Sequence, residues 1–86
     1  MGYFVYILFS KSCNRFYTGQ TQDFEKRLIE HNSGETKSIK SCTPWNLVWK
    51  TELTTRSEAM SLEKKIKARG AARFLADIGI VVSRGA

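Results

Sequence analysis

The pattern of apolar and polar positions divides the chain into short strands and helices. An uncharged run of aromatic and β-branched side chains at residues 3–9 predicts a strand covered on both faces, at the centre of a small sheet. A polar turn at residues 10–14 leads to a second short strand at residues 15–19, so the two strands are expected to form an antiparallel hairpin. A third strand is predicted at residues 45–53. Its apolar centre consists of Leu47, Val48 and Trp49.

The register of the hairpin decides how its two tyrosines are arranged. If Ser10 pairs with Arg15, then Tyr6 and Tyr17 project from the same face of the sheet. A slip of one residue would place the two rings on opposite faces. The sequence pattern alone leaves this register open.

The segment after the second strand predicts a short basic helix. Gly19 ends the strand at a point where the chain must turn sharply or approach a ligand closely, and Asp23 is a suitable N-cap. The apolar stripe of the helix consists of Phe24, Leu28 and, at its margin, Ile29. Gly34 is placed to end the helix in a left-handed conformation. Arg27 and His31 are four residues apart, so they share one face and can reach one partner together.

The second half of the chain predicts a loop and two further helices. Residues 35–44 are polar and basic without a hydrophobic period, which indicates a mobile surface loop. Thr55 and Glu58 form a capping box that begins a helix. Residues 71–78 follow as a last short helix, and the tail from Gly79 is expected to be loosely held. A chain of 86 residues predicts a single domain.

The helix that begins after Thr55 runs to about Arg69 and places Glu63 beside its apolar stripe. This stripe consists of Ala59, Leu62 and Ile66. A carboxylate half inside the core-facing arc is costly unless it is paired or bound to something. An ion pair with Lys67, four residues further along, is one solution.

Composition and charge narrow the classes of partner and location. A net charge of +6 and a pI near 9.6 are high for this length, and they favour a polyanion such as nucleic acid, although a basic excess also serves solubility. No apolar run approaches the roughly 18 residues that span a bilayer, and no signal-peptide pattern is visible. Cys13 and Cys42 lack a CxxC spacing, and the single His31 does not complete a zinc set. Free thiols in a reducing compartment, and therefore a cytoplasmic location, are expected.

Five short segments occur in a distinctive order within residues 3–70. They are Val5-Tyr6, Tyr17-Thr18-Gly19, Lys26-Arg27-Leu28 with His31, residues 44–49, and Ala59-Met60-Ser61-Leu62-Glu63. In this order the chain resembles the GIY-YIG endonuclease superfamily, in particular its small stand-alone bacterial branch, which is similar to the N-terminal cleavage domain of the excision-repair nuclease. Phe4 and Thr18 replace the Gly and Ile of the motif name. No Asn follows the glutamate helix, where several family members carry one.

The resemblance implies an α+β fold in which a small three-stranded antiparallel sheet is flanked by helices. The domain would comprise residues 1–86, with its core at about residues 3–70 and a short helix and tail at residues 71–86. The implied activity is that of an endonuclease, which hydrolyses phosphodiesters with one divalent cation, Mg²⁺ or Mn²⁺. A structure-selective role in DNA repair or recombination would follow. DNA is the expected partner, while RNA and the oligomeric state are left open.

The resemblance also implies a role for each candidate residue. Glu63 would hold the metal through a carboxylate oxygen. Arg27 would clamp the scissile phosphate with its planar guanidinium. Either Tyr6 or Tyr17 would accept the proton of the attacking water. Assistance by hydrogen bonding or phosphate contact is implied for His31 and Lys26.

The same residue types have plainer interpretations. Both tyrosines fit an ordinary core, Arg27 can pair with Glu30, and His31 suits the C-terminal end of a helix. Two other functions therefore stand beside the nuclease. The absence of a late Asn motivates a nucleic-acid-binding module with weak or no cleavage activity, and the basic face would also suit an acidic protein partner.

Overall fold

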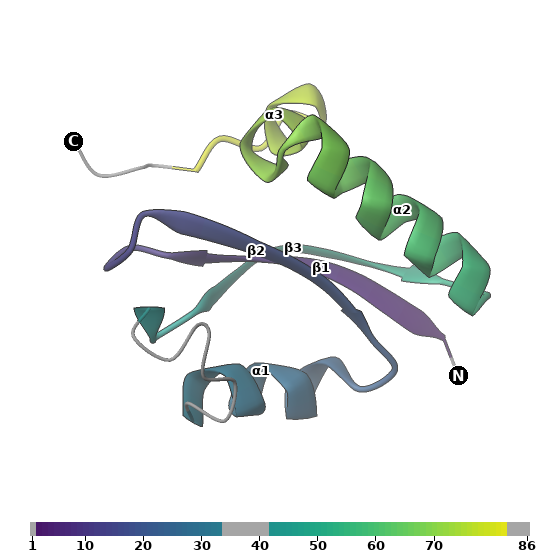
Figure 1. Ribbon diagram of the computed structural model, residues 1–86, viewed down its shortest axis with the longest axis horizontal. Coiled ribbons are helices and arrows are strands. Elements are labelled where there is room, and N and C mark those ends of the chain that lie inside the picture. Colours follow the sequence, from purple (N-terminus) through teal and green to yellow (C-terminus); the bar gives the residue numbers. More distant parts are fainter. Residues whose placement is uncertain (1, 34–41, 83–86) are drawn as a thin grey trace.

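One three-stranded sheet organises the molecule (Figure 1). The computed structural model describes residues 2–33 and 42–82. The strands are β1 (Tyr3–Ser10), β2 (Arg15–Thr21) and β3 (Asn46–Leu53). They are antiparallel in the order β2-β1-β3, so β1 is central and β2 forms an edge. The expected α+β fold and the central position of the first strand are confirmed.

The hairpin register places both tyrosines on one face. Ser10 pairs with Arg15 and Leu8 pairs with Tyr17. Because alternate residues of a strand share a face, Tyr6 lies on the same side of β1 as Leu8, and therefore on the side of Tyr17. The strand continues past Gly19 to Thr21, so the expectation that Gly19 ends the strand is wrong.

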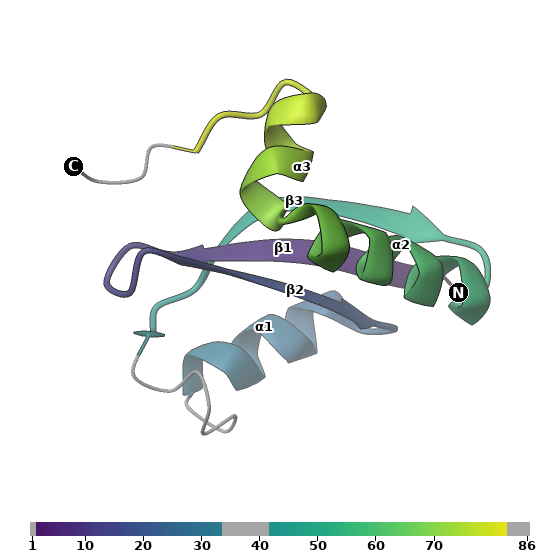
Figure 2. The ribbon, with the colours of Figure 1, turned by 45° about the horizontal axis from the view of Figure 1, so that its top comes forward.

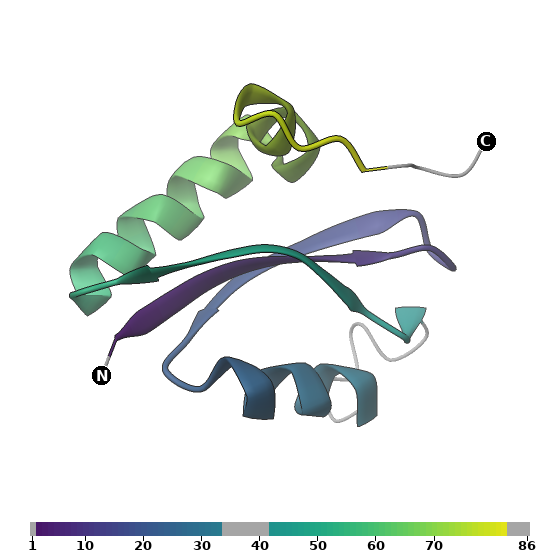
Figure 3. The ribbon, with the colours of Figure 1, turned by 180° about the vertical axis from the view of Figure 1, so that it is seen from behind.

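The helices lie on opposite faces of the sheet (Figures 1 and 3). α1 (Phe24–Ser33) covers one face, while α2 (Arg56–Arg69) and α3 (Ala71–Asp77) cover the other. The predicted caps are confirmed, because the Lys26 N–H donates to Asp23 Oδ1 at 3.1 Å and the Thr55–Glu58 capping box is formed. Within residues 2–33 and 42–82, none of the helices has the length and apolarity needed to cross a bilayer.

Each face of the sheet has its own core. Under α2 and α3, the buried side chains are Val5, Ile7, Ala59, Ile66 and Leu75. Under α1, they are Tyr6, Leu8, Phe24, Cys42 and Trp45. Successive residues of β1 alternate between the two sets, as expected for a strand covered on both sides. Ile29 does not join the stripe of α1, because it is 67% exposed.

The segment after α3 is packed rather than loose up to residue 82. The Ile80 N–H donates to the Leu75 carbonyl oxygen at 2.8 Å, and Ile80 and Val82 pack against the aliphatic core. The prediction of a loosely held tail is therefore wrong for residues 79–82. Residues 83–86, the predicted helix end at Gly34 and most of the predicted loop at 35–44 lie outside the described residues.

A disulfide joins Cys13 to Cys42, which corrects the expectation of free thiols. Cys13 lies in the turn between β1 and β2, and Cys42 lies shortly before β3. Both segments meet the same end of β1, where Ser10 pairs with Arg15 and Phe9 pairs with Asn46. The two Cα atoms are consequently 5.3 Å apart. The argument from free thiols to a reducing compartment therefore fails, and the cytoplasmic location remains a prediction.

Candidate active site

Gly19 allows the Tyr6 ring to reach the outer edge of the sheet. The two residues are directly opposite each other on β1 and β2. A Cβ atom at Gly19 would lie 2.6 Å from Tyr6 Oη and 2.9 Å from Tyr6 Cζ. It would also lie 3.0 Å from Tyr17 Cε1. The close approach expected at this glycine is therefore made by a side chain of the same protein, and it brings the Tyr6 hydroxyl over the edge strand.

His31, a residue of α1, contacts the Tyr6 hydroxyl between the helix and the sheet. Tyr6 Oη and His31 Nε2 are 3.1 Å apart, and the two side chains are almost completely buried. Burial lowers the pKa of His31, and the neighbouring positive charge of Arg27 lowers it further. The ring is therefore neutral near pH 7, so Nε2 is an acceptor in one tautomer and a donor in the other. Among the described residues, His31 Nδ1 has no hydrogen-bond partner.

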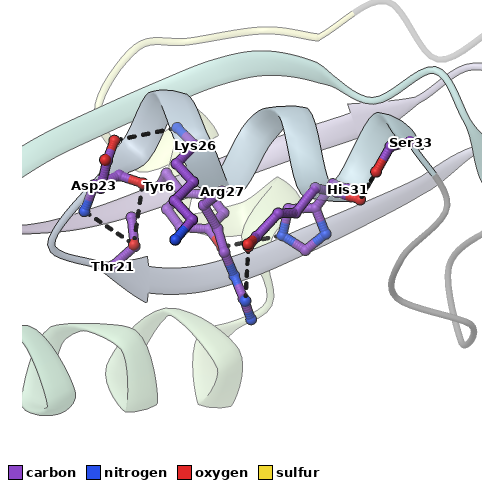
Figure 4. Close-up of polar contacts among 8 residues, drawn as sticks. Tyr6, Thr21, Asp23, Lys26, Arg27, His31 and Ser33 are labelled. Carbon is purple, nitrogen blue, oxygen red and sulfur yellow. Dashed lines mark hydrogen bonds and ion pairs between the residues drawn. The ribbon is translucent and has the colours of Figure 1, made fainter.

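Arg27 brings a positive charge to the same hydroxyl (Figure 4). Burial raises the pKa of Tyr6 to about 12, and the facing guanidinium opposes this rise. Arg27 Nη1 also lies 3.4 Å from Glu30 Oε1, which is the ion pair expected from the spacing. Arg27 Nε is buried without a hydrogen-bond partner in the described part of the chain. Arg27 and His31 thus meet at one partner, as their shared helix face predicted.

Tyr17 completes the cluster from the edge strand. Its ring centroid lies 4.6 Å from that of His31, 6.0 Å from that of Trp45 and 6.3 Å from that of Tyr6. Trp45 is in turn fixed by Asn32, whose Oδ1 accepts from the Trp45 N–H at 2.6 Å. The Asn32 amide nitrogen donates back to the Trp45 carbonyl oxygen at 3.2 Å. Both tyrosines are therefore held in place by α1 and by the segment before β3.

Glu63 approaches the same edge strand from the opposite face of the sheet. Gln20 Nε2 of β2 donates to Glu63 Oε1 at 3.0 Å, and Lys67 Nζ lies 3.0 Å from Glu63 Oε2. The Glu63 side chain keeps 19% of its surface exposed. Its negative charge is one of the influences that raise the pKa of Tyr6, so the two groups are within electrostatic reach. The expected ion pair with Lys67 is present, and each carboxylate oxygen has one protein partner.

An open groove of about 430 Å³ lies beside Arg27, at the junction of β2 and α1. Gln20 and Lys26 also line this groove, which we call the Arg27 groove. Lys26 is exposed, and its position suits contact with a phosphate that also meets Arg27. The buried His31 ring is better placed to orient Tyr6 than to touch a ligand directly.

The site contains one candidate carboxylate ligand for a divalent cation such as Mg²⁺, namely that of Glu63. Among the described residues, no three His, Cys, Asp or Glu side chains gather into a metal cage. Mg²⁺ often keeps several waters and binds through one or two carboxylates together with substrate phosphates. The partly exposed Glu63 fits that pattern, provided that Lys67 moves away from the carboxylate or shares it.

Several contacts of the site have no local signal in the sequence. Gln20 contacts a carboxylate 43 positions further along the chain, and Asn32 binds Trp45 across 13 positions. The sequence around a polar residue in a short strand or at a helix end does not indicate which distant residue it will contact. The alternation of β2 does place Gln20 on the face of Val5 and Ile7, toward α2, so its side of the sheet follows from the register.

Comparison with known proteins gives consistent matches. The model of the GIY-YIG catalytic domain matches residues 2–74. A UPF0213 protein of Staphylococcus epidermidis is 41% identical over 68 residues, which cover 76% of this chain and 79% of that protein. A UPF0213 protein of Haloquadratum walsbyi is 43% identical over 67 residues, which cover 77% and 74%. The solution NMR structure of a UPF0213 protein from Bacillus halodurans superposes with a TM-score of 0.57 at 30% identity, covering 92% of this chain and 86% of that one.

Proposed function

This chain belongs to the GIY-YIG family of nuclease domains, and from that membership we propose that it is an endonuclease that hydrolyses DNA phosphodiesters with one divalent cation. The main support is that groups from both faces of the sheet reach neighbouring residues of the edge strand. On the α1 side, the Tyr6 ring lies against Gly19 and its hydroxyl is faced by Arg27 and His31. On the α2 side, Glu63 accepts a hydrogen bond from Gln20, the next residue of β2. Phosphoryl-transfer sites need the same parts, namely a proton acceptor, a cation facing the phosphate and a carboxylate for a metal.

The substrate phosphate would bind in the Arg27 groove. The guanidinium is planar and always charged, so it can contact two phosphate oxygens and stabilise the charge that develops during attack. Lys26 adds a second cation at the rim. A Mg²⁺ or Mn²⁺ ion held by Glu63 would supply Lewis-acid stabilisation of the leaving oxygen. The surface is too small for extended base readout, so recognition would rest on the backbone and shape of the DNA, including branched structures.

The Tyr6–His31 contact suggests a path for the proton. With a pKa of about 12, the Tyr6 hydroxyl keeps its proton near neutral pH. As the water oxygen bonds to phosphorus and the bond to the leaving oxygen breaks, the water proton passes to Tyr6 Oη. The Tyr6 proton passes at the same time to Nε2 of neutral His31, and the leaving oxygen takes a proton from solvent. Tyr17 would then support the His31 ring by packing.

The test is cleavage of labelled single-stranded, duplex and branched DNA with Mg²⁺ or Mn²⁺. Glu63→Gln should lower kcat by at least about 100-fold while leaving binding without metal in place. Glu52→Gln is the matched control, because it removes an equal charge from an exposed position on β3. Loss of activity in both variants, or in neither, would contradict the assignment of Glu63.

The two tyrosines are separated by the same assay. Tyr6→Phe should lower kcat by about 10²- to 10⁴-fold, as expected for loss of a proton-transfer group. Tyr17→Phe should change kcat much less, because it keeps the ring that packs on His31. The reverse order of effects would make Tyr17 the proton acceptor.

A nucleic-acid-binding module is the second candidate. The observation in its favour is that both oxygens of Glu63 already have protein partners, Gln20 and Lys67. A protein of this kind would bind DNA in a salt-dependent manner and would show no metal-dependent cleavage of any of the three substrates. Glu63→Gln would then leave its affinity unchanged.

A further inference from the structure

A second open groove, of about 510 Å³, lies along β2 where α2 passes into α3. Figure 2 shows α3 turning away from the end of α2 above the sheet. Three cationic side chains line the groove, which we call the Arg73 groove. They are Lys67, Arg69 and Arg73. No acidic side chain is among its lining residues within the described part of the chain.

The Glu63 carboxylate contacts one lining residue of each groove, although it lines neither groove itself. Gln20, which lines the Arg27 groove, donates to Glu63 Oε1. Lys67, which lines the Arg73 groove, contacts Glu63 Oε2. The two grooves also follow each other along the edge strand, because residues 16–18 line one and residues 20–21 line the other. A ligand bound in the Arg27 groove can therefore extend along β2, past Glu63, into the Arg73 groove.

Of the three cations that line this groove, Arg73 is the one without an ion pair among the described residues. Lys67 is paired with Glu63 at 3.0 Å, and Arg69 is paired with Asp77 at 2.9 Å. Arg73 is exposed and makes no ion pair among the described residues. Gly70 also lines the groove, and the space beside it is open, since a Cβ atom there would meet nothing within 4 Å. An open basic surface of this kind suits a flexible polyanion.

We propose that one nucleic-acid strand continues from the scissile phosphate at Glu63 into the Arg73 groove, with Arg73 as a phosphate contact. The inference rests on the proposed function for the position of the scissile phosphate. The edge from residue 16 to residue 21 is roughly 17 Å long. Successive phosphates of one strand are spaced closely enough for an edge of this length to contact more than one of them. The assignment extends the substrate contact beyond the catalytic residues to α3.

The first measurement is the salt dependence of binding to a fluorescein-labelled single-stranded DNA, followed by anisotropy in EDTA so that no cleavage occurs. Arg73→Gln should weaken binding by about tenfold, the equivalent of one charged contact. The slope of log affinity against log salt should fall by about 0.7, as expected for one phosphate contact fewer. An unchanged slope would overturn the proposal.

Arg56→Gln is the matched control. It makes the same chemical change at an exposed position at the other end of α2, about 20 Å from Arg69. An equal loss of affinity in both variants would mean that only the net charge of the protein matters, and it would overturn the proposal that the strand binds in the Arg73 groove. A polyglutamate peptide should displace the labelled DNA less effectively than unlabelled DNA does. Equal displacement would overturn the proposal that the groove binds a nucleic-acid strand.

A second measurement fixes the direction of the strand. Oligonucleotides are shortened in steps from the 5′ or the 3′ side of the cleavage position. The effect of Arg73→Gln should disappear when one of the two sides is shortened and should persist for the other. If wild type cleaves none of the oligonucleotides while the effect of Arg73→Gln on binding still depends on which end is shortened, the groove stands and the nuclease proposal fails. If wild type cuts and Arg73→Gln has no effect on either side, only the groove fails.

Discussion

The two faces of the sheet are held to their helices by different kinds of interaction. The face under α2 and α3 buries aliphatic side chains such as Val5, Ile7 and Leu75. The face under α1 also buries polar atoms, among them the Tyr6 hydroxyl and the His31 ring. Burying a polar atom costs free energy unless it is hydrogen-bonded. Among the described residues, Arg27 Nε and His31 Nδ1 are buried on this face without a partner. Three catalytic candidates have a shifted pKa, namely Tyr6, Arg27 and His31, and all three belong to this second face.

Under α1, directional bonds are added to an apolar core that includes Leu8 and Phe24. The Cys13–Cys42 disulfide ties the β1–β2 turn to the segment before β3. The Ser10 hydroxyl donates to the Cys42 carbonyl oxygen at 2.5 Å. Asn32 fixes Trp45, which packs on Tyr17. The geometry of the site should therefore respond to reduction, protonation and single added atoms, whereas the other face should respond mainly to lost volume.

Removal of volume under α3 should give the largest loss of stability. Leu75→Ala deletes a side chain that is 1% exposed, and such changes cost about 2–5 kcal/mol of unfolding free energy. The measurement is urea unfolding followed by circular dichroism. The kcat of the folded fraction at low temperature should remain within about twofold of wild type. Tyr6, Arg27 and His31 lie on the other face, and Glu63 is held in place by its own contacts with Gln20 and Lys67. A parallel collapse of kcat would show that the two faces are not independent.

Opening the disulfide should have a comparable effect on stability and a larger one on the site. The bridge joins residues 29 positions apart, for which the loop-entropy model gives roughly 3–4 kcal/mol. Cleavage should fall together with stability, since Cys42 packs in the cluster that holds Tyr6 and Trp45. The assay compares wild type with and without dithiothreitol.

The double variant Cys13→Ser, Cys42→Ser is the control for that experiment. It should resemble reduced wild type and be insensitive to dithiothreitol. An unfolding midpoint of wild type that does not change on reduction would contradict the importance of the bridge for α1.

The difference between the faces also explains what the sequence could predict. The central position of β1 and its two-sided burial follow from the uncharged apolar run at residues 3–9. The stripe of Ala59 and Ile66 follows from helical periodicity. The place of Glu63 beside that stripe follows from helix geometry, and so does its ion pair with Lys67. The packing of the α2 face can thus be predicted from the sequence, because it depends on the spacing and size of apolar side chains.

The α1 face was predicted less completely, because its contacts join distant segments. Nothing local pairs Cys13 with Cys42 or Asn32 with Trp45. Gly19 shows the same difficulty in another form. A glycine within a polar segment marks a turn or a close approach equally well, and only the register shows that the approaching group is the Tyr6 ring.

A methyl group at Gly19 should have the next largest effect. Gly19→Ala places Cβ within 3.0 Å of both tyrosine rings, and such overpacking costs about 1–3 kcal/mol. The displaced Tyr6 hydroxyl should lose His31, so kcat should fall strongly. The check is a double-mutant cycle with Tyr6→Phe, measured by urea unfolding. Because Tyr6→Phe removes the oxygen that would lie 2.6 Å from the new methyl, the pair should destabilise less than the sum of the single changes. Simple additivity would contradict the close approach.

The pH dependence of stability should give the smallest effect, because a single proton carries it. Burial holds the pKa of His31 below its usual value, so the unfolded chain takes up a proton at His31 before the folded protein does. The free energy of unfolding should therefore be constant above about pH 6.5 as far as His31 is concerned, and should decrease as the pH falls through that value. His31→Gln keeps a polar group near Tyr6 and removes the titration. Urea unfolding of both proteins between about pH 5 and 8 should show a steeper loss for wild type on the acidic side. Parallel curves would mean that the imidazolium is tolerated next to Arg27, and that His31 is not confined to the neutral form that accepts the Tyr6 proton.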